Sequence, residues 1–93
     1  MSRSEMQKTI VELQKSINEG GRASHFLARA YISFYRRGNN IELYDYIHLD
    51  AINRDLFHRM MRLRHIEGWS DSELYQNYLF CCNYVNDLTA LEQ

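Results

Sequence analysis

The apolar residues of the chain recur at helical spacing in four segments. In the first segment, Ser4–Asn18, they are separated by steps of four, three and four: Met6, Ile10, Leu13 and Ile17. Such steps place the side chains on one face of a helix. The pair Gly20 and Gly21 predicts the end of this helix, because glycine adopts the left-handed conformation common at helix C-termini.

The second and third segments are also amphipathic. The second segment, Arg22–Arg37, carries an apolar stripe of Phe26, Leu27, Ala30, Tyr31 and Phe34. Gly38 and two asparagines predict where it stops. The third segment begins at Asp50, a favoured N-cap residue, and Gly68 closes it. Its predicted stripe is Ile52, Leu56, Met60 and Leu63, flanked by Phe57, Met61 and Ile66.

The fourth segment opens with the sequence Ser-Asp-Ser-Glu at Ser70–Glu73, which is a capping box and predicts a helix start. Its stripe then runs through Leu74, Tyr78, Cys81, Val85 and Leu88. Further apolar residues widen this stripe beyond what a helix docked on one side requires. We therefore predict a homodimer that hides Phe80 or Tyr84.

The stretch between the second and third helices, Ile41–Asp50, fits neither a period of two nor a period of 3.6. Either a short helical turn or an extended linker packed on the core is consistent with it. We expect its aliphatic residues to be buried and its tyrosines to supply the exposed binding residues. The aliphatic set is Ile41, Leu43, Ile47 and Leu49, and the tyrosines are Tyr44 and Tyr46.

These patterns predict an all-α fold, a compact bundle of four helices with a short irregular segment between the second and third. The 93 residues make one domain, residues 1–93. Hydrophobic residues are 45% and charged residues 25%, which is the composition of a globular protein. Proline is absent, so the chain lacks the turn signals of an all-β protein.

Targeting and redox signals are weak. No apolar run reaches the roughly 20 residues that cross a bilayer, and the N-terminus lacks the apolar core of a signal peptide. We expect a cytoplasmic protein that does not bind membranes. Cys81 and Cys82 are adjacent, which argues against a loop-closing disulfide and predicts buried, reduced thiols.

No catalytic or metal-binding constellation is apparent. The four histidines lack the close His or Cys spacing of a zinc site: His25, His48, His58 and His65. Two thiols inside an apolar stripe usually only pack, and no glycine-rich phosphate loop is present. The sequence therefore predicts no enzyme activity, no metal and no cofactor.

Charge alternates along the chain: +4 over residues 22–37, −3 over 38–50, +3 over 51–66 and −5 over 67–93. The two basic segments could form one phosphate-binding patch for a nucleic acid. Its candidate residues are Arg22, Arg29, Arg54, Arg59 and Arg62. Alternation of sign and a net charge of −1 favour pairing of these arginines with carboxylates inside the domain instead.

Aromatic residues are abundant, with seven tyrosines, four phenylalanines and one tryptophan. Tyrosine and tryptophan suit protein interfaces because they combine an apolar body with a polar tip. The same residues could instead line the core of a small bundle. The interpretation we adopt is a small, non-enzymatic protein-binding module. Its predicted partner-binding residues are Arg36, Arg37, Tyr44, Tyr46, Trp69, Phe80 and Tyr84.

The stretch Gly21–Phe57 resembles the signature of a small, uncharacterised family of α-helical bacterial proteins, often carried on proteobacterial plasmids, integrated elements and phages. The matching positions are Gly21, Ser24 (displaced by one), Phe26, Leu27, Ala30, Tyr31, Phe34, Gly38, Leu43, Asp50 and Asp55. The C-terminal third departs, since that family has a Tyr-Pro turn where this chain has Glu67–Ser70. The resemblance implies a helical fold and a mobile-element origin, and from that origin we expect a host or defence complex as the target. It implies no activity and no functional residue.

Overall fold

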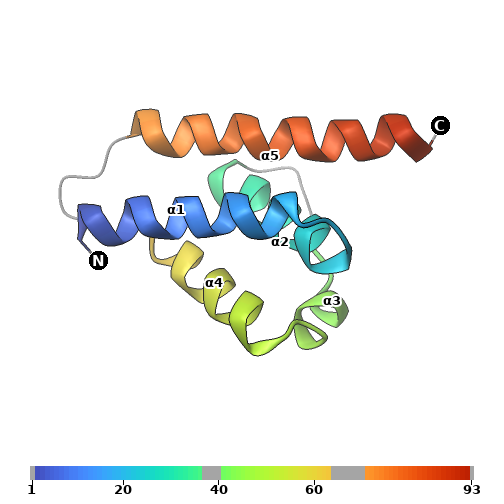
Figure 1. The fold of residues 1–93 in the computed structure, drawn as a ribbon, viewed down its shortest axis with the longest axis horizontal. Coiled ribbons are helices and arrows are strands. Elements are labelled where there is room, and N and C mark those ends of the chain that lie inside the picture. Colours follow the sequence, from blue (N-terminus) through green and yellow to red (C-terminus); the bar gives the residue numbers. More distant parts are fainter. Residues whose placement is uncertain (1, 37–40, 64–70, 93) are drawn as a thin grey trace.

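Five helices make up the part of the chain that the computed structural model describes, residues 2–36, 41–63 and 71–92, with side chains described through residue 86. They are α1 (Arg3–Asn18), α2 (Arg22–Tyr35), α3 (Leu43–Ile47), α4 (Ala51–Met61) and α5 (Asp71–Glu92) (Figure 1). Those residues contain no β-strand. The radius of gyration is 12.7 Å, close to the roughly 12 Å expected of a compact domain of this length. The predicted all-α, compact fold is confirmed.

The central element is α2, which contacts each of the other four helices. Half of its 14 residues are buried: Ser24, Phe26, Leu27, Ala28, Ala30, Tyr31 and Ile32. In Figure 1, α5 and α4 lie on opposite sides of α1. The core therefore forms around α2, and each surrounding helix contributes one face to it.

Local sequence signals explain where the helices begin and end. The Ser2 hydroxyl accepts a hydrogen bond from the Glu5 backbone N–H, which caps the first turn of α1. Gly20 and Gly21 have φ angles of +80° and +97°, in the region that glycine tolerates best, and they turn the chain into α2. The Asp50 carboxylate accepts from Asn53 N–H at 2.8 Å, as predicted for the N-cap of α4.

Three sequence expectations need correction. The fold class placed a short irregular segment between the second and third long helices, whereas residues 43–47 form α3, which agrees with the short helical turn left open as an alternative. Ile52 was placed on the core stripe of α4, but its side chain is 74% exposed. It lines the opening between α1 and α4, where polar side chains occupy the contact. The predicted second helix extended through Arg37, whereas α2 ends at Tyr35; Arg37 lies outside the described residues, as does Ser70 of the capping box.

A buried hydroxyl fastens α2 to α5. The Tyr31 side chain is fully buried, and its hydroxyl donates a 2.7 Å hydrogen bond to the Leu74 backbone carbonyl. The aromatic ring packs against Phe34 and stacks on Tyr35. Because a buried hydroxyl requires a partner, this bond fixes how α5 lies on α2.

A second buried hydroxyl closes the turn between α1 and α2. Ser24 Oγ lies 2.6 Å from the Ser16 carbonyl oxygen and 2.9 Å from the Gly20 carbonyl oxygen. Ser16 lies in the last turn of α1 and Gly20 in the turn that follows it, so this hydroxyl joins the start of α2 to the end of α1. In the described part of the chain, no helix has the length and apolar character needed to span a membrane.

The Tyr31 bond gives a direct test of the core. Tyr31→Phe keeps the ring but leaves the Leu74 carbonyl without this donor, so we expect a loss of about 1 kcal/mol in unfolding free energy. For a domain of this size that is a melting temperature lower by roughly 4–8 °C. Tyr44→Phe, a matched change at an exposed tyrosine, should leave urea unfolding unchanged. Equal curves for the two variants would contradict this assignment.

Candidate functional site

The short helix α3 presents its apolar side chains to solvent. Leu43 is 75% exposed, and Tyr44 and Ile47 are each 61% exposed. None of the five residues of α3 is buried. We call Leu43, Tyr44 and Ile47 the α3 patch. A surface helix normally turns its apolar face to the core, so this arrangement is the reverse of the usual one.

The opposite side of α3 is fixed to α4 by Tyr46. Its ring lies 5.2 Å from the Phe57 ring, centroid to centroid. Its hydroxyl forms a 2.7 Å hydrogen bond with His58 Nε2. The Arg54 guanidinium lies 5.7 Å from the centroid of the same ring. Aromatic packing, a hydrogen bond and a cation–π contact therefore hold this helix in place.

The chain on either side of α3 is anchored as well. Ile41, before the helix, is half-buried and packs against the core, and Leu49, after it, is only 6% exposed. Arg54 Nη2 donates to the carbonyl oxygens of Ile47 and Leu49, at 3.4 and 3.1 Å. These bonds satisfy carbonyls at the C-terminal end of the helix. The α3 patch is thus carried on an ordered support.

Tyr44 itself is also constrained, although most of its surface is exposed. Its ring lies 4.4 Å from the His48 ring, centroid to centroid. His48 Nδ1 forms a 2.8 Å hydrogen bond with the Tyr44 carbonyl oxygen. A partner would therefore meet a tyrosine that has already lost part of its rotamer freedom.

The burial expected for this segment was wrong at three residues. Leu43 and Ile47 were predicted to be buried, and Tyr46 to be exposed; the structure reverses these roles. At about 100° per residue, Ile47 lies about 40° from Leu43 around the helix, whereas Tyr46 lies about 100° from Ile47 and about 160° from Tyr44. The aromatic ring took the inner position because Phe57 and His58 offer it both a packing surface and a hydrogen-bond partner.

Arg36 belongs to a separate aromatic cluster where the C-terminal end of α2 meets α5. Its guanidinium lies over three tyrosine rings: 5.9 Å from Tyr35, 5.9 Å from Tyr75 and 5.0 Å from Tyr78. A hydrogen bond with Cys82 raises the pKa of the Tyr78 hydroxyl, and burial adds to this effect. The arginine therefore covers an aromatic surface between two helices of the core.

The other predicted partner-binding residues fall in different places. Phe80 and Tyr84 on α5 are half-buried and pack against the core. Arg37 and Trp69 lie outside the described residues. The structure thus separates Tyr44, in the α3 patch, from the tyrosine cluster beneath Arg36.

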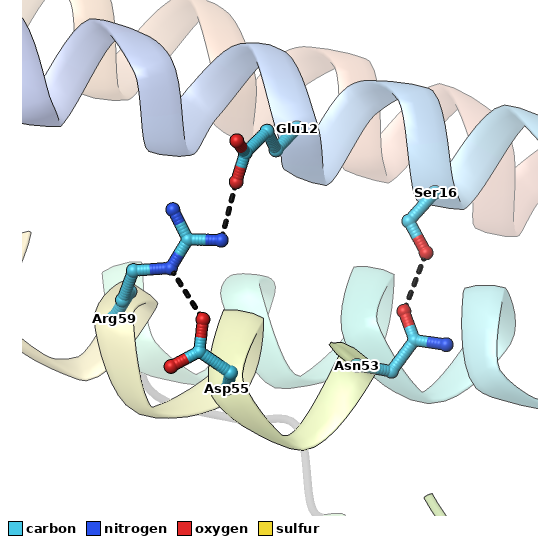
Figure 2. A network of polar contacts seen from close by, with 5 residues as sticks. All are labelled: Glu12, Ser16, Asn53, Asp55 and Arg59. Carbon is cyan, nitrogen blue, oxygen red and sulfur yellow. Dashed lines mark hydrogen bonds and ion pairs between the residues drawn. The ribbon is translucent and has the colours of Figure 1, made fainter. Parts of the chain in front are cut away.

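Polar contacts join α1 to α4, as Figure 2 shows. Arg59 lies between two carboxylates: its Nη2 pairs with Glu12, and its Nε lies 2.9 Å from an Asp55 oxygen. Farther along, Ser16 Oγ donates a 2.6 Å hydrogen bond to Asn53 Oδ1. An opening of about 470 Å³ lies beside these contacts. Arg59 is therefore occupied within the domain.

The remaining arginines of the nucleic-acid alternative are dispersed. Arg54 bonds the chain around α3, as described above. Arg29 is half-buried and lines a small cavity of about 110 Å³ together with Glu42 and Asp45. Arg22 is exposed at the start of α2, and Arg62 is exposed at the end of α4. Nucleic-acid binding remains a prediction, and these positions supply no compact basic patch for it.

Comparison of the chain with protein-family models, with curated proteins and with solved structures finds no match.

Two leucines near α3 provide a matched pair. Leu49→Ala removes a buried side chain and should lower the unfolding free energy by about 2 kcal/mol or more. Leu43→Ala removes an exposed side chain and should change it by no more than about 0.5 kcal/mol. Chemical denaturation measures both. A larger loss for Leu43→Ala would mean that α3 packs the other way round.

The buried thiol gives a test of pH dependence. Burial, together with the neighbouring Cys82 thiolate, raises the pKa of Cys81 from 9.0 to about 12. Between these values the folded state binds more protons than the unfolded state, so the unfolding free energy should fall as pH rises. Cys81→Ala should flatten that fall, and Cys82→Ala, which keeps the buried thiol, should retain most of it. Parallel profiles for wild type and Cys81→Ala would contradict this interpretation.

Proposed function

We propose that this chain is a small, non-enzymatic, cytoplasmic protein-binding module whose α3 patch docks on another protein. The four long helices act as a four-helix bundle that supports the patch. The observation that carries the proposal is the exposure of Leu43, Tyr44 and Ile47 on a helix whose opposite side is firmly anchored.

The energetics favour an interface at this position. Burying a leucine or isoleucine side chain fully contributes about 1.5–3 kcal/mol relative to leaving it exposed. Within the described chain the α3 patch gains none of this, because its side chains remain exposed. Binding to a partner with an apolar groove would bury these side chains, and the complex would gain this free energy. The fixed backbone and the Tyr44–His48 stack lower the entropy lost in the complex.

The origin suggested by the family resemblance points to a class of partner. A protein carried on a plasmid, integrated element or phage benefits from modulating or inhibiting a host or defence complex. The short patch suits insertion into a preformed groove, the mode in which a few helical side chains act as anchors. The nucleic-acid alternative is supported less well, since Arg54 and Arg59 are held by contacts within the domain.

A capture experiment with two matched variants tests the proposal. Immobilised wild-type protein is incubated with a bacterial lysate, and captured proteins are quantified by mass spectrometry. Ile47→Glu places a charge in the α3 patch and should abolish capture of the specific partner. Ile52→Glu makes the same change on α4, at a residue that is 74% exposed and lies outside the α3 patch, and should leave capture unchanged.

The dissociation constants of wild type and Ile47→Glu for the purified partner then test the proposal quantitatively. We expect Ile47→Glu to weaken binding by at least about tenfold, or about 1.4 kcal/mol, while its melting temperature stays at the wild-type value. If Ile47→Glu binds the same partner as tightly as wild type does, the α3 patch is not the interface.

A further inference from the structure

A shallow groove runs between α1 and α5, away from the α3 patch. The two helices are joined along it by the Arg3–Glu73 ion pair at 3.0 Å and by a 3.0 Å hydrogen bond from Gln14 Nε2 to Asn77 Oδ1. The groove has a volume of about 490 Å³. On the α1 side it is lined by Gln7, Ile10, Val11 and Gln14. Their spacing of three, one and three residues forms a single helical face.

This face carries almost no charge. Its one ionised residue, Glu73, is paired with Arg3. Beyond Glu73, the stretch Leu74–Asn86 contains no charged residue over 13 positions of α5. Leu79 and Gln76 are nevertheless exposed. Exposed helix surfaces normally carry charged residues, so an uncharged helix face of this length is unusual for a surface in contact with water.

Two buried polar atoms beside the groove lack a hydrogen-bond partner among the described residues: Asn77 Nδ2 and Glu73 Oε2. The Asn77 side chain is almost completely buried, and its other amide atom is used by Gln14. A buried donor without an acceptor is costly, and such an atom calls for an explanation. Both atoms are buried beneath the surface of the groove, so an occupant of the groove does not contact them directly.

We infer that the occupant is a second copy of this chain, with α1 and α5 of each copy packed against α1 and α5 of the other. In a twofold interface residue i meets residue j of the partner and j meets i, so a charged residue close to the axis would oppose its own like charge. Carboxamides avoid this conflict, because each offers both a donor and an acceptor to its counterpart. The apolar residues Ile10 and Val11 and the glutamines around them are therefore self-complementary.

The charges of the whole molecule agree with this choice of occupant. A net charge of −1 gives two copies little reason to repel each other. Glu5, Lys8, Glu12 and Lys15 lie on the other faces of α1, and Arg3, beside the groove, is paired with Glu73. A charged partner protein would find no counter-charge in the groove, whereas a second copy needs none.

The size of the face sets the expected strength. The 16 residues of α1 span about 24 Å, and two helices side by side are about 20 Å wide. A face of these dimensions falls at the small end of specific interfaces, so the dimer should dissociate in the micromolar range, on the order of 10–100 µM.

Sedimentation of the 93-residue chain, with a reductant present to exclude disulfides through Cys82, tests the inference. Wild type should shift with concentration from 11.2 kDa toward twice that mass. Val11→Glu puts a charge into the groove and should raise the dissociation constant at least tenfold. Its far-ultraviolet circular dichroism and melting temperature should match wild type, because Val11 is exposed. Ile47→Glu, the same charge placed on the α3 patch, should dimerise as wild type does.

Three results would overturn the inference: wild type that stays at 11.2 kDa up to several hundred micromolar, Val11→Glu that dimerises normally, or Ile47→Glu that is monomeric. In the last case the copies meet through the α3 patch. Because partner capture is scored on Ile47→Glu and self-association on Val11→Glu, either proposal can fail while the other stands.

Discussion

Burial of α2 is the constraint on which the rest of the structure depends. A chain of 93 residues can enclose one helix well, and here it encloses this one by placing α1, α3, α4 and α5 around it. The small residues Ala28 and Ala30 are buried on α2 and allow neighbouring helices to approach closely. The Tyr31 hydroxyl adds direction to this packing, because its bond to the Leu74 carbonyl fixes how α5 lies across the core. Apolar burial thus supplies the energy, and the buried Tyr31 hydroxyl contributes to the orientation of α5.

One consequence is that the outer faces of the surrounding helices are free to carry other chemistry. Where α1 meets α4 outside the core, the helices are joined by polar contacts of Arg59 and Asn53 (Figure 2). The α3 helix uses its outer face differently, since Leu43 and Ile47 are exposed there. The side of α3 that faces α4 is occupied by Tyr46. Its ring packs on Phe57, its hydroxyl bonds His58, and the Arg54 guanidinium lies over the same ring. Because Tyr46 fills the contact between α3 and α4, Leu43 and Ile47 do not reach the core.

The sequence could predict the long helices because each repeats the same signal several times. In α1 the predicted stripe is fully buried at Met6, Leu13 and Ile17 and half-buried at Ile10, and in α4 the predicted cap at Asp50 forms. A five-residue helix offers no such repetition, so periodicity could not decide which face of α3 is buried. The available signal was the spacing of Leu43 and Ile47, four residues apart, with Tyr46 out of phase.

Contacts between distant residues were beyond the sequence for a different reason. Arg59 pairs with Glu12 across 47 positions, and nothing in either segment specifies that choice over Glu42 or Glu73. The exposure of Ile52 has the same origin, because it depends on how α4 crosses α1. Local patterns thus determine that a helix forms, while the packing of its neighbours determines which residues its surface displays.

The two surfaces proposed for binding differ in chemistry in a way that separates their roles. The α3 patch is small, apolar and anchored, which suits insertion into a groove of another protein. The α1–α5 face is broader and rich in carboxamides, which suits contact with an identical face. Residues of α3 line neither wall of that groove, so the two surfaces do not compete for the same side chains. A dimer built through α1 and α5 would carry two α3 patches on one particle. If the target is itself a multi-subunit complex, binding at two positions raises the effective affinity without any new contact. A module with a weak patch and a weak dimer could therefore bind an assembled complex tightly and its isolated subunits poorly.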